Sequence, residues 1–486
     1  MVAWTHLSVG VLPYGEQVSD TELISLDSST GRMVVAAATL GSGLTLLDGT
    51  VVNVALKTIG EDLDASLADL QWITNGYLLS MASLILLGGA LGDRFGRRRI
   101  FVIGTVWFAL ASLLCGIAPT PLVLIVARGL QGIGAALLTP GSLSIIQSVF
   151  RPADRGTAIG AWSGLGGIAA AIGPFIGGAL VQYVSWRWIF LINLPLAVIT
   201  VLIAQRYVPE TRDARATGRF DIPGAALACI ALGGVTWALI EWGKPSALYA
   251  AAGGLLCGAA FIVVEARGRE PMMPLGLFSN RTFGAANAMT FLVYAALGAV
   301  LFFLVIQLQT VAGYGALQAG IATLPITVCM LFLASRAGAL GTRIGPRIPM
   351  TVGPIVMAAG TLLLLAVDAD TSYWRDVFPG LTVFGLGLSL MVAPLTGTVL
   401  AAAPDENAGI ASGVNNAVAR AGSLLAVAAL PVAVGLSGEE YAVASAFDAA
   451  YARAAVICAV LLALGGVVSW LTIRNPRPDL ADAPVV

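Results

Sequence analysis

The chain has 486 residues, of which 58% are hydrophobic and only 11% are charged, and its mean hydropathy is +0.88. A soluble protein of this size is about one quarter charged. Its apolar runs are also shorter than the stretches of about 20 residues that recur along this sequence. The composition excludes a soluble globular fold, and the continuously apolar runs exclude the alternating strands of a membrane β-barrel. It predicts an all-α integral membrane protein.

Net charge and rare residue types narrow the chemistry further. A formal net charge of −1 offers no basic surface for nucleic acid. The five cysteines lie in apolar runs without CxxC spacing, and the only histidine is His6. These residues cannot build a histidine-based metal site, a catalytic triad or a histidine proton relay. We therefore expect no enzyme activity, no metal ion and no cofactor.

Fourteen apolar runs follow a polar start. Residues 1–32 carry no basic segment ahead of an apolar core, which predicts a cytoplasmic N-terminal tail and not a signal peptide. Eight runs lie near residues 33–56, 71–91, 100–118, 121–147, 156–181, 187–206, 222–242 and 247–266. Six more lie near residues 285–309, 316–336, 349–367, 375–400, 408–436 and 450–472. Each run is long enough to cross a bilayer as a helix.

The loops between these runs alternate in positive charge. With the N-terminus inside, the cytoplasmic segments carry 19 arginines and the outer loops carry five basic residues. Because positive residues favour the cytoplasmic side, the alternation supports fourteen spans with both termini in the cytoplasm. The two remaining arginines, Arg128 and Arg420, lie within apolar runs.

A repeat divides the chain into two similar parts. GALGDRFGRRR begins at Gly89, and GALGTRIGPR begins at Gly338, with seven identical positions at a constant offset of 249 residues. The copies stand eight spans apart, so two spans are inserted between two six-helix units. The predicted parts are an N-terminal bundle at 33–208, a linker with the two inserted helices at 209–270, a C-terminal bundle at 271–474 and a cytoplasmic tail at 475–486. Transporters commonly consist of such repeats, with the substrate path between them.

One acid and one base lie deep within the first bundle. A carboxylate such as Asp48 in an apolar span costs about 2.5–3.5 kcal/mol, so it normally has a partner or a task. Asp48 lies about 12 Å below the outer end of its run, and Arg128 lies about 11 Å below the outer end of the run at 121–147. Two alternatives follow: the pair carries a proton between the two sides of the membrane, or it only locks two helices together. We favour the first, because ionisable residues within a membrane are usually functional.

Several motifs resemble those of the major facilitator superfamily, and within it those of the drug:proton antiporters with fourteen helices. The most specific motif is Gly-x-Leu-x-Asp-Arg-x-Gly-Arg-Arg at Gly89–Arg98. Four further motifs are LDGTVVNVAL from Leu47, RGLQGIGAA from Arg128, GPFIGG from Gly173 and WRWIFLINLP from Trp186. The chain departs from the first of these four at Lys57, where the family usually has proline.

The resemblance implies roles for two of these motifs. The loop residues would form a gate: Gly89, Asp93, Arg94, Gly96, Arg97 and Arg98. Asp93 would pair with the N-terminal dipole of a helix in the other bundle and hold the inner side shut. The plain alternative is a basic cluster that keeps the loop inside. Gly173, Pro174, Gly177 and Gly178 match the motif associated with export, and the plain alternative is tight helix packing.

Polar and aromatic residues within the spans are candidates for a substrate cavity. Ser412, Asn416 and Arg420 are spaced by four, so they share one face of a helix. Arg420 has no acid at comparable depth in its own bundle. The predicted cavity residues are Asn53, Gln131, Trp162, Asn416 and Arg420.

The leading functional hypothesis is proton-coupled efflux of amphipathic organic compounds, such as drugs or antibiotics, by alternating access. No Gly-x4-Gly-Lys-Ser/Thr phosphate loop exists, so we expect the proton gradient, and no ATPase subunit, to drive a monomer in the lipid bilayer. The alternatives are a proton-coupled importer or dedicated exporter of one metabolite, and a membrane sensor that does not transport. Two lysines against 24 arginines are typical of a GC-rich genome, and we expect a bacterial plasma membrane.

Overall fold

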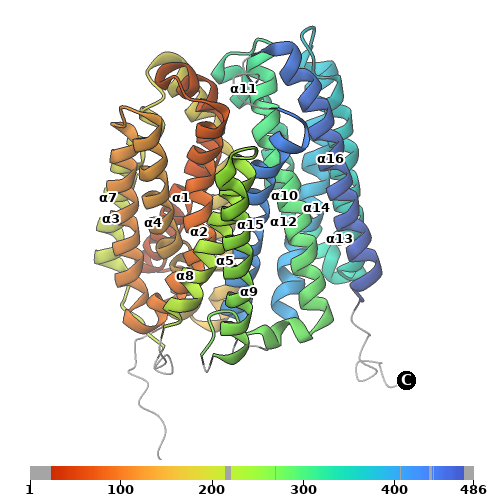
Figure 1. Cartoon of the computed structure of the whole chain (residues 1–486). Helices are drawn as coiled ribbons and strands as arrows, with labels where there is room; N and C mark the ends of the chain where they lie inside the picture. Colours follow the sequence, from red (N-terminus) through yellow and green to blue (C-terminus); the bar gives the residue numbers. More distant parts are fainter. Residues whose placement is uncertain are drawn as a thin grey trace, which may run out of the picture.

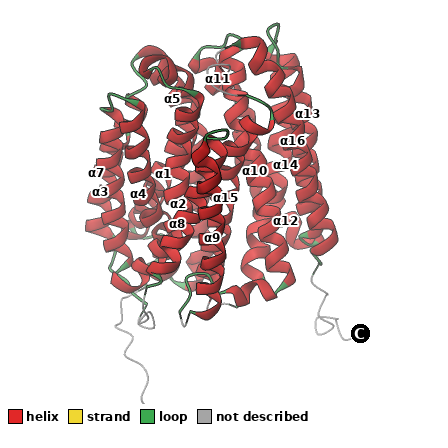
Figure 2. Cartoon of the chain, in the orientation of Figure 1, coloured by secondary structure: helices red, strands yellow, loops and turns green. Residues whose placement is uncertain are grey.

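The computed structural model of the chain is a bundle of long helices (Figures 1 and 2). It describes residues 23–213, 220–268, 270–404, 407–436, 441 and 443–475. Fourteen helical segments among these residues are long and apolar enough to cross a membrane, which confirms the predicted count. The only β-type pairing in the described ranges is an isolated bridge between Ile24 and Phe150.

The N-terminal bundle contains six spans. Its helices are α1 (Ser29–Leu63), α2 (Leu67–Phe95), α3 (Arg97–Gly116), α4 (Pro121–Val149), α5 (Pro152–Tyr183), α6 (Trp188–Leu191) and α7 (Asn193–Tyr207). Side-chain caps mark where they begin: Ser66 and Asp69 form a capping box at α2, and Thr120 caps α4 ahead of Pro121. Such caps satisfy the free N–H groups of a first turn. The short α6 and the longer α7 together make the sixth span.

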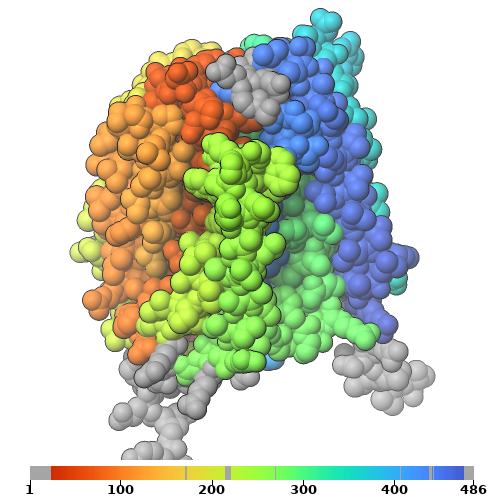
Figure 3. Space-filling view, viewed as in Figure 1, coloured from red at the N-terminus to blue at the C-terminus, as the bar shows by residue number. Residues whose placement is uncertain are grey.

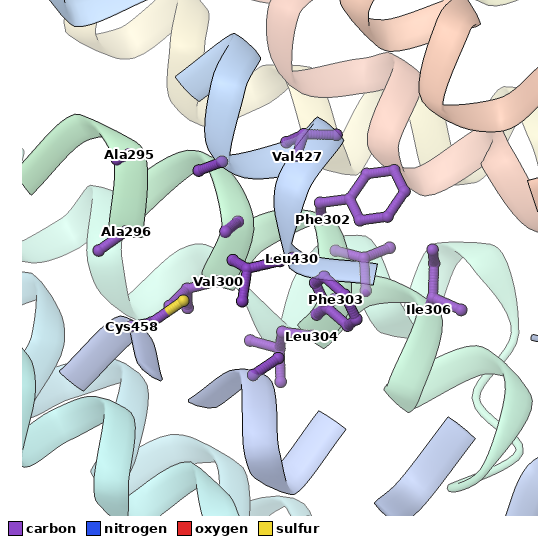
Figure 4. Close-up of a cluster of buried hydrophobic side chains, with 14 of the residues drawn as sticks. Ala295, Ala296, Val300, Phe302, Phe303, Leu304, Ile306, Val427, Leu430 and Cys458 are labelled. Carbon is purple, nitrogen blue, oxygen red and sulfur yellow. The ribbon is translucent and has the colours of Figure 1, made fainter. Parts of the chain in front are cut away.

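The C-terminal bundle repeats this arrangement. Its helices are α10 (Arg281–Thr310), α11 (Ala316–Ala322), α12 (Leu324–Ile344), α13 (Arg347–Leu363), α14 (Phe378–Ala401), α15 (Ala408–Ala433) and α16 (Ala444–Thr472). Figure 4 shows Phe302 and Phe303 of α10 beside Val427 and Leu430 of α15. The ring of Phe303 also stacks on Phe447 of α16, with 5.8 Å between centroids. The five cysteines form no disulfide in the structure, and Cys115, Cys329 and Cys458 are buried as small apolar side chains.

The repeated loops have the same structural task in each bundle. Gly96 and Gly345 end α2 and α12 with φ of +113° and +83°, a conformation that favours glycine. The next helix of each bundle is then capped from the end of the same bundle. Arg98 N donates to Glu210 Oε1 at 3.1 Å, and Arg347 N donates to Asn475 Oδ1 at 3.2 Å.

The two arginines also bind the last helix of their own bundle. The Arg98 guanidinium donates to Val208 O at 3.0 Å, and that of Arg347 donates to Trp470 O at 3.0 Å. Cations favour the C-terminal end of a helix, where carbonyl groups lack partners. Each repeated loop therefore fastens the second, third and sixth spans of its bundle together.

The first residues that the structure describes are bound to the rest of the protein, although the sequence predicts a tail there. The predicted N-terminal tail at 1–32 is too long, because α1 already begins at Ser29 and residues 23–28 are docked. Ile24 N donates to Val149 O at 2.9 Å, and Leu26 N donates to Asp154 at 3.2 Å. Residues 1–22 and 476–486, the rest of the two predicted tails, lie outside the described residues.

The two inserted helices, α8 (Ile222–Ile240) and α9 (Pro245–Arg267), lie across the junction of the bundles. In Figure 3 they form the green strip in front, between the orange N-terminal bundle and the blue C-terminal bundle. Helix α8 packs against both α2 and α15, with Trp237 beside Trp72 at 5.7 Å between ring centroids. Most of α9 is exposed, and only 11% of the residues in its most apolar stretch are buried inside the protein.

Candidate functional site

Asp48 of α1 and Arg128 of α4 meet within the N-terminal bundle, as their depths predict. Arg128 Nη1 lies 2.5 Å from Asp48 Oδ2, and the two side chains are 2% and 0% exposed. A pair this deeply buried is worth little net stability by itself, because both ions lose their hydration. The contribution of the ion pair to stability therefore depends on the groups that surround it.

Neutral polar groups complete the surroundings of the carboxylate. Gln131 Nε2 donates to Asp48 Oδ1 at 2.8 Å, and Arg128 Nη1 donates to Gln131 Oε1 at 2.6 Å. Asn193 of α7 reaches the same carboxylate oxygen at 3.5 Å and also donates to Ser112 Oγ of α3 at 3.0 Å. The acid therefore links four helices of the bundle, α1, α3, α4 and α7, through one set of hydrogen bonds.

Gln131 and its neighbours differ from the sequence prediction. Gln131 was predicted to line the substrate cavity, but in the described conformation it is fully buried among the hydrogen bonds around Asp48, so a role in substrate binding stays a prediction. Ser112 and Asn193 were not predicted at all. Each is a polar residue within an apolar run near the outer end, and this feature could have indicated them.

Aromatic rings and a backbone carbonyl hold the guanidinium from the other side. The Arg128 guanidinium carbon lies 4.4 Å from the ring centroid of Tyr77 and 5.7 Å from that of Phe190, a cation–π arrangement. Its Nε donates to Ile73 O at 3.1 Å. Arg128 therefore keeps partners other than Asp48, so protonation of Asp48 would remove the ionic tie between α1 and α4 and leave the arginine held by α2.

The gating loop is engaged within its own bundle. Asp93 Oδ1 lies 2.8 Å from Arg97 Nη2, and Asp93 O accepts a hydrogen bond from Asp213 N at 2.9 Å. The predicted pairing of Asp93 with a helix of the other bundle is not made in this conformation, because Arg97, one turn further along the chain, is the nearer charge. Arg94 lies over the ring of Phe220, at 4.9 Å. A latch in another conformation stays a prediction.

The bundles are joined at the side that the charge pattern predicts to be outer. Lys57 Nζ donates to Gln309 O at 2.9 Å, and Gln309 Nε2 donates back to Val54 O at 2.9 Å. Nearby, Tyr441 Oη donates to Ala65 O at 2.9 Å. Lys57, which replaces the family's usual proline, thus ties α1 to α10. The described conformation is closed on the outer side.

The glycine motif of α5 permits this closure. A Cβ atom on Gly173 would clash with Thr50, and one on Gly177 would clash with Val51, both on α1 of the same bundle. Gly178 faces the other bundle, where a Cβ would lie 2.7 Å from Ala316 O and 2.7 Å from Leu317 Cα. The motif therefore combines close packing inside one bundle with close contact between the two.

Replacing Gly178 by alanine is expected to loosen the outer closure. The new methyl group meets backbone atoms of α11, which cannot rotate away, and overpacking of this kind costs about 1–3 kcal/mol. We expect the population of the outer-closed state to fall about tenfold per 1.4 kcal/mol, and efflux to fall with it. The measurement is the spin-label distance between exposed positions Tyr183 and Trp374. Gly167→Ala on the same helix is the control, since nothing lies within 4 Å of its Cβ position; equal distance distributions in the two variants would contradict the prediction.

The remaining predicted cavity residues are more accessible. Asn53 is half-buried one turn before Lys57, on a face of α1 that reaches α10. Trp162 is half-buried on α5 and donates from Nε1 to Ser42 Oγ at 3.0 Å. Asn416 is exposed and donates to Ser412 O at 3.0 Å. Arg420 is half-buried on the same face of α15. Their roles in substrate binding stay predictions.

Two repeated six-helix bundles with a buried acid–base pair and a closed outer junction define a multi-pass membrane transporter fold. The chain belongs to the Major Facilitator Superfamily, whose family model matches residues 38–427. It is 36% identical over 406 residues to the "Tetracenomycin C resistance and export protein" of Streptomyces glaucescens, covering 82% of this chain and 74% of the relative. It is 35% identical to a puromycin resistance protein of Streptomyces alboniger, covering 93% and 92%. A partially occluded, inward-open structure of the xylose transporter XylE from E. coli shares the fold, with a TM-score of 0.64, 15% identity, and coverage of 92% and 100%.

Proposed function

We propose that the protein exports small amphipathic organic compounds, such as drugs or antibiotics, in exchange for protons. The names of the similar resistance and export proteins support export of this class of compound. The observation that carries proton coupling is the buried Asp48, whose carboxylate is held by a cation and two amides among helices of one bundle. An acid in such a site can take up a proton only when the conformation admits one.

The proposed cycle uses the ionic tie between α1 and α4 as its switch. When the site opens outward, Asp48 takes up a proton and its bond to Arg128 weakens. When the site opens inward, the proton leaves and the ion pair forms again. Substrate moves in the opposite direction through the junction between the bundles, as repeat transporters do. The protein acts as a monomer in the plasma membrane, with both termini in the cytoplasm and with no cofactor or ATPase subunit.

A dedicated exporter of one metabolite is the second candidate. The observation that favours it is that each of the two relatives is named for a single antibiotic. The two candidates share the same coupling chemistry and differ only in the breadth of substrates. A panel of unrelated dyes and antibiotics separates them, because a dedicated exporter confers resistance to one member alone.

Efflux from cells tests the proposed coupling directly. A pump-deficient bacterial host that expresses the protein is loaded with Nile red, a neutral lipophilic dye, and the loss of fluorescence is followed after glucose is added. We expect at least tenfold faster efflux than in the empty host, and complete arrest when an uncoupler collapses the proton gradient. Efflux that continues unchanged in the presence of the uncoupler would contradict proton exchange.

A further inference from the structure

Arg420 lies on a face of α15 that is directed at the junction between the bundles. On one flank of this helix lies α10, because Asn415 donates to Asn287 at 3.1 Å and Ser423 donates to Tyr294 O at 2.8 Å. On the other flank lies α2, because Gln71 donates to Val427 O at 2.7 Å. Ser412, Asn416 and Arg420 form the face between these flanks, since residues four apart share one side of a helix.

The guanidinium of Arg420 has no partner of its own. Within the described ranges it makes no hydrogen bond and no ion pair, and its buried Nε is unsatisfied. Two tyrosines belong to the helices that flank this arginine: Tyr294 on α10, whose backbone carbonyl accepts from Ser423, and Tyr77 on α2, which follows Gln71 on that helix. The hydroxyl of Tyr77 is also buried without a hydrogen-bond partner. A cation without an ion pair and a hydroxyl without a hydrogen bond therefore lie on two helices, α15 and α2, that pack against each other at the junction.

The charge balance of this region favours an anion. Asp48 and Arg128 cancel each other within the N-terminal bundle, with 2.5 Å between their nearest atoms. Nothing in the described structure cancels Arg420 in the same way. A half-buried arginine within a membrane span is costly without a counterion, and its planar fork binds a carboxylate through two parallel hydrogen bonds. A bound anion is the missing partner.

We propose that Arg420 binds an anionic group of the transported compound, a carboxylate or an ionised phenol, so that the preferred substrates are amphipathic anions. This inference rests on the proposed function and specifies its substrate class. Tyr77 donates its free hydroxyl to the same anion, and the ring of Tyr294 covers the apolar part beside it. Cationic compounds are disfavoured, because Arg420 repels them.

An anionic substrate changes what drives the transport. Outward movement of one negative charge in exchange for inward movement of one proton transfers two unit charges in the same direction. Such an exchange is driven by the membrane potential as well as by the pH difference. Exchange of a monovalent cation for one proton would be electroneutral and indifferent to the potential.

Binding of two matched dyes to the purified full-length protein tests the proposal. Fluorescein is anionic at pH 8 and rhodamine 6G is cationic on the same three-ring frame, and fluorescence polarisation reports both affinities. We expect the unmodified protein to prefer fluorescein. Arg420→Gln is expected to weaken fluorescein binding at least tenfold and to leave rhodamine 6G binding unchanged or tighter. Arg453→Gln is the control and should change neither affinity, because this exposed arginine bonds, among the described residues, only to Ala449 of its own helix.

Further outcomes keep the test independent of folding and of proton coupling. Arg420→Lys keeps the charge without the planar fork and should retain part of the fluorescein affinity. Equal weakening of both dyes by Arg420→Gln, or fluorescein binding that stays within twofold of the unmodified protein, would overturn the proposal. A preference of the unmodified protein for rhodamine 6G would overturn it without any variant. Because binding needs no gradient, these results leave the efflux test of the proposed function unaffected.

Discussion

Replacing Asp48 by asparagine is expected to abolish proton-driven efflux and to leave exchange of substrate for substrate intact. The amide keeps the shape of the side chain, including an acceptor for Gln131, but it cannot release or take up a proton. Efflux driven by a proton gradient should fall to the level of liposomes without protein. Counterflow of labelled substrate, which needs no gradient, should continue, because the substrate path does not include Asp48. Reconstituted liposomes allow both measurements on one preparation.

The matched control for this variant is Asp62→Asn on the same helix. Asp62 lies near the outer end of α1, is half-exposed, and pairs with Arg187 at 2.7 Å and with the indole of Trp186 at 2.8 Å. Exposed pairs of this kind contribute about 0–1 kcal/mol, and this acid lies away from the buried site. Proton-driven efflux and counterflow should both persist in the Asp62→Asn variant. Loss of counterflow together with driven efflux in a folded Asp48→Asn protein would assign Asp48 a structural task instead of coupling.

Removing Arg128 alone is expected to destabilise the protein strongly, and removing both charges is expected to restore most of the loss. Arg128→Met leaves the buried Asp48 without its cation, and breaking a buried pair in this way costs about 3–5 kcal/mol. The double variant Asp48→Asn with Arg128→Met contains no uncompensated charge, and replacing a buried pair with neutral groups is often close to neutral in stability. Thermal unfolding in detergent, followed by the fluorescence of a thiol-reactive dye that labels the buried cysteines, measures all four proteins of the cycle.

The double variant also separates stability from function. It should be folded and yet unable to couple efflux to protons, because no carboxylate remains at the site. Arg187→Met, which removes a partly exposed arginine from its pair with Asp62, is the control and should shift unfolding by the equivalent of about 1 kcal/mol or less. A double variant that is stable and pumps at the full rate would mean that the pair only locks α1 to α4.

The architecture was largely predictable from the sequence, because it depends on the length of the apolar runs and on the positive charge of the loops between them. A bilayer requires about 20 apolar residues per helix, and arginines remain on the cytoplasmic side, so spans could be counted without knowledge of packing. The repeat at Gly89 and Gly338 was likewise visible, because its glycines occupy loop conformations that other residues rarely adopt. The docking of Arg98 to Glu210 was not predictable, because it joins segments that are 112 positions apart.

The candidate site was predictable in depth but not in orientation. Counting residues along two spans placed Asp48 and Arg128 at one level, and the structure brings them together. The rotation of a helix about its axis depends on tertiary packing, which a nearly uniform apolar run does not reveal. For this reason Gln131 was expected in a cavity although it bonds to Asp48, and Asn193 was missed in an apolar stretch.

The position of α8 makes the two flanks of the molecule unequal. Where α2 and α15 meet, the inserted helices α8 and α9 cover the contact and separate it from the surrounding lipid. On the opposite flank α5 meets α12 directly, and the glycines near the inner end of α5 have open space beside them. We therefore expect a lipophilic substrate dissolved in the inner leaflet to enter from the bilayer along α5. A variant that lacks α8 and α9 should admit the substrate from both flanks.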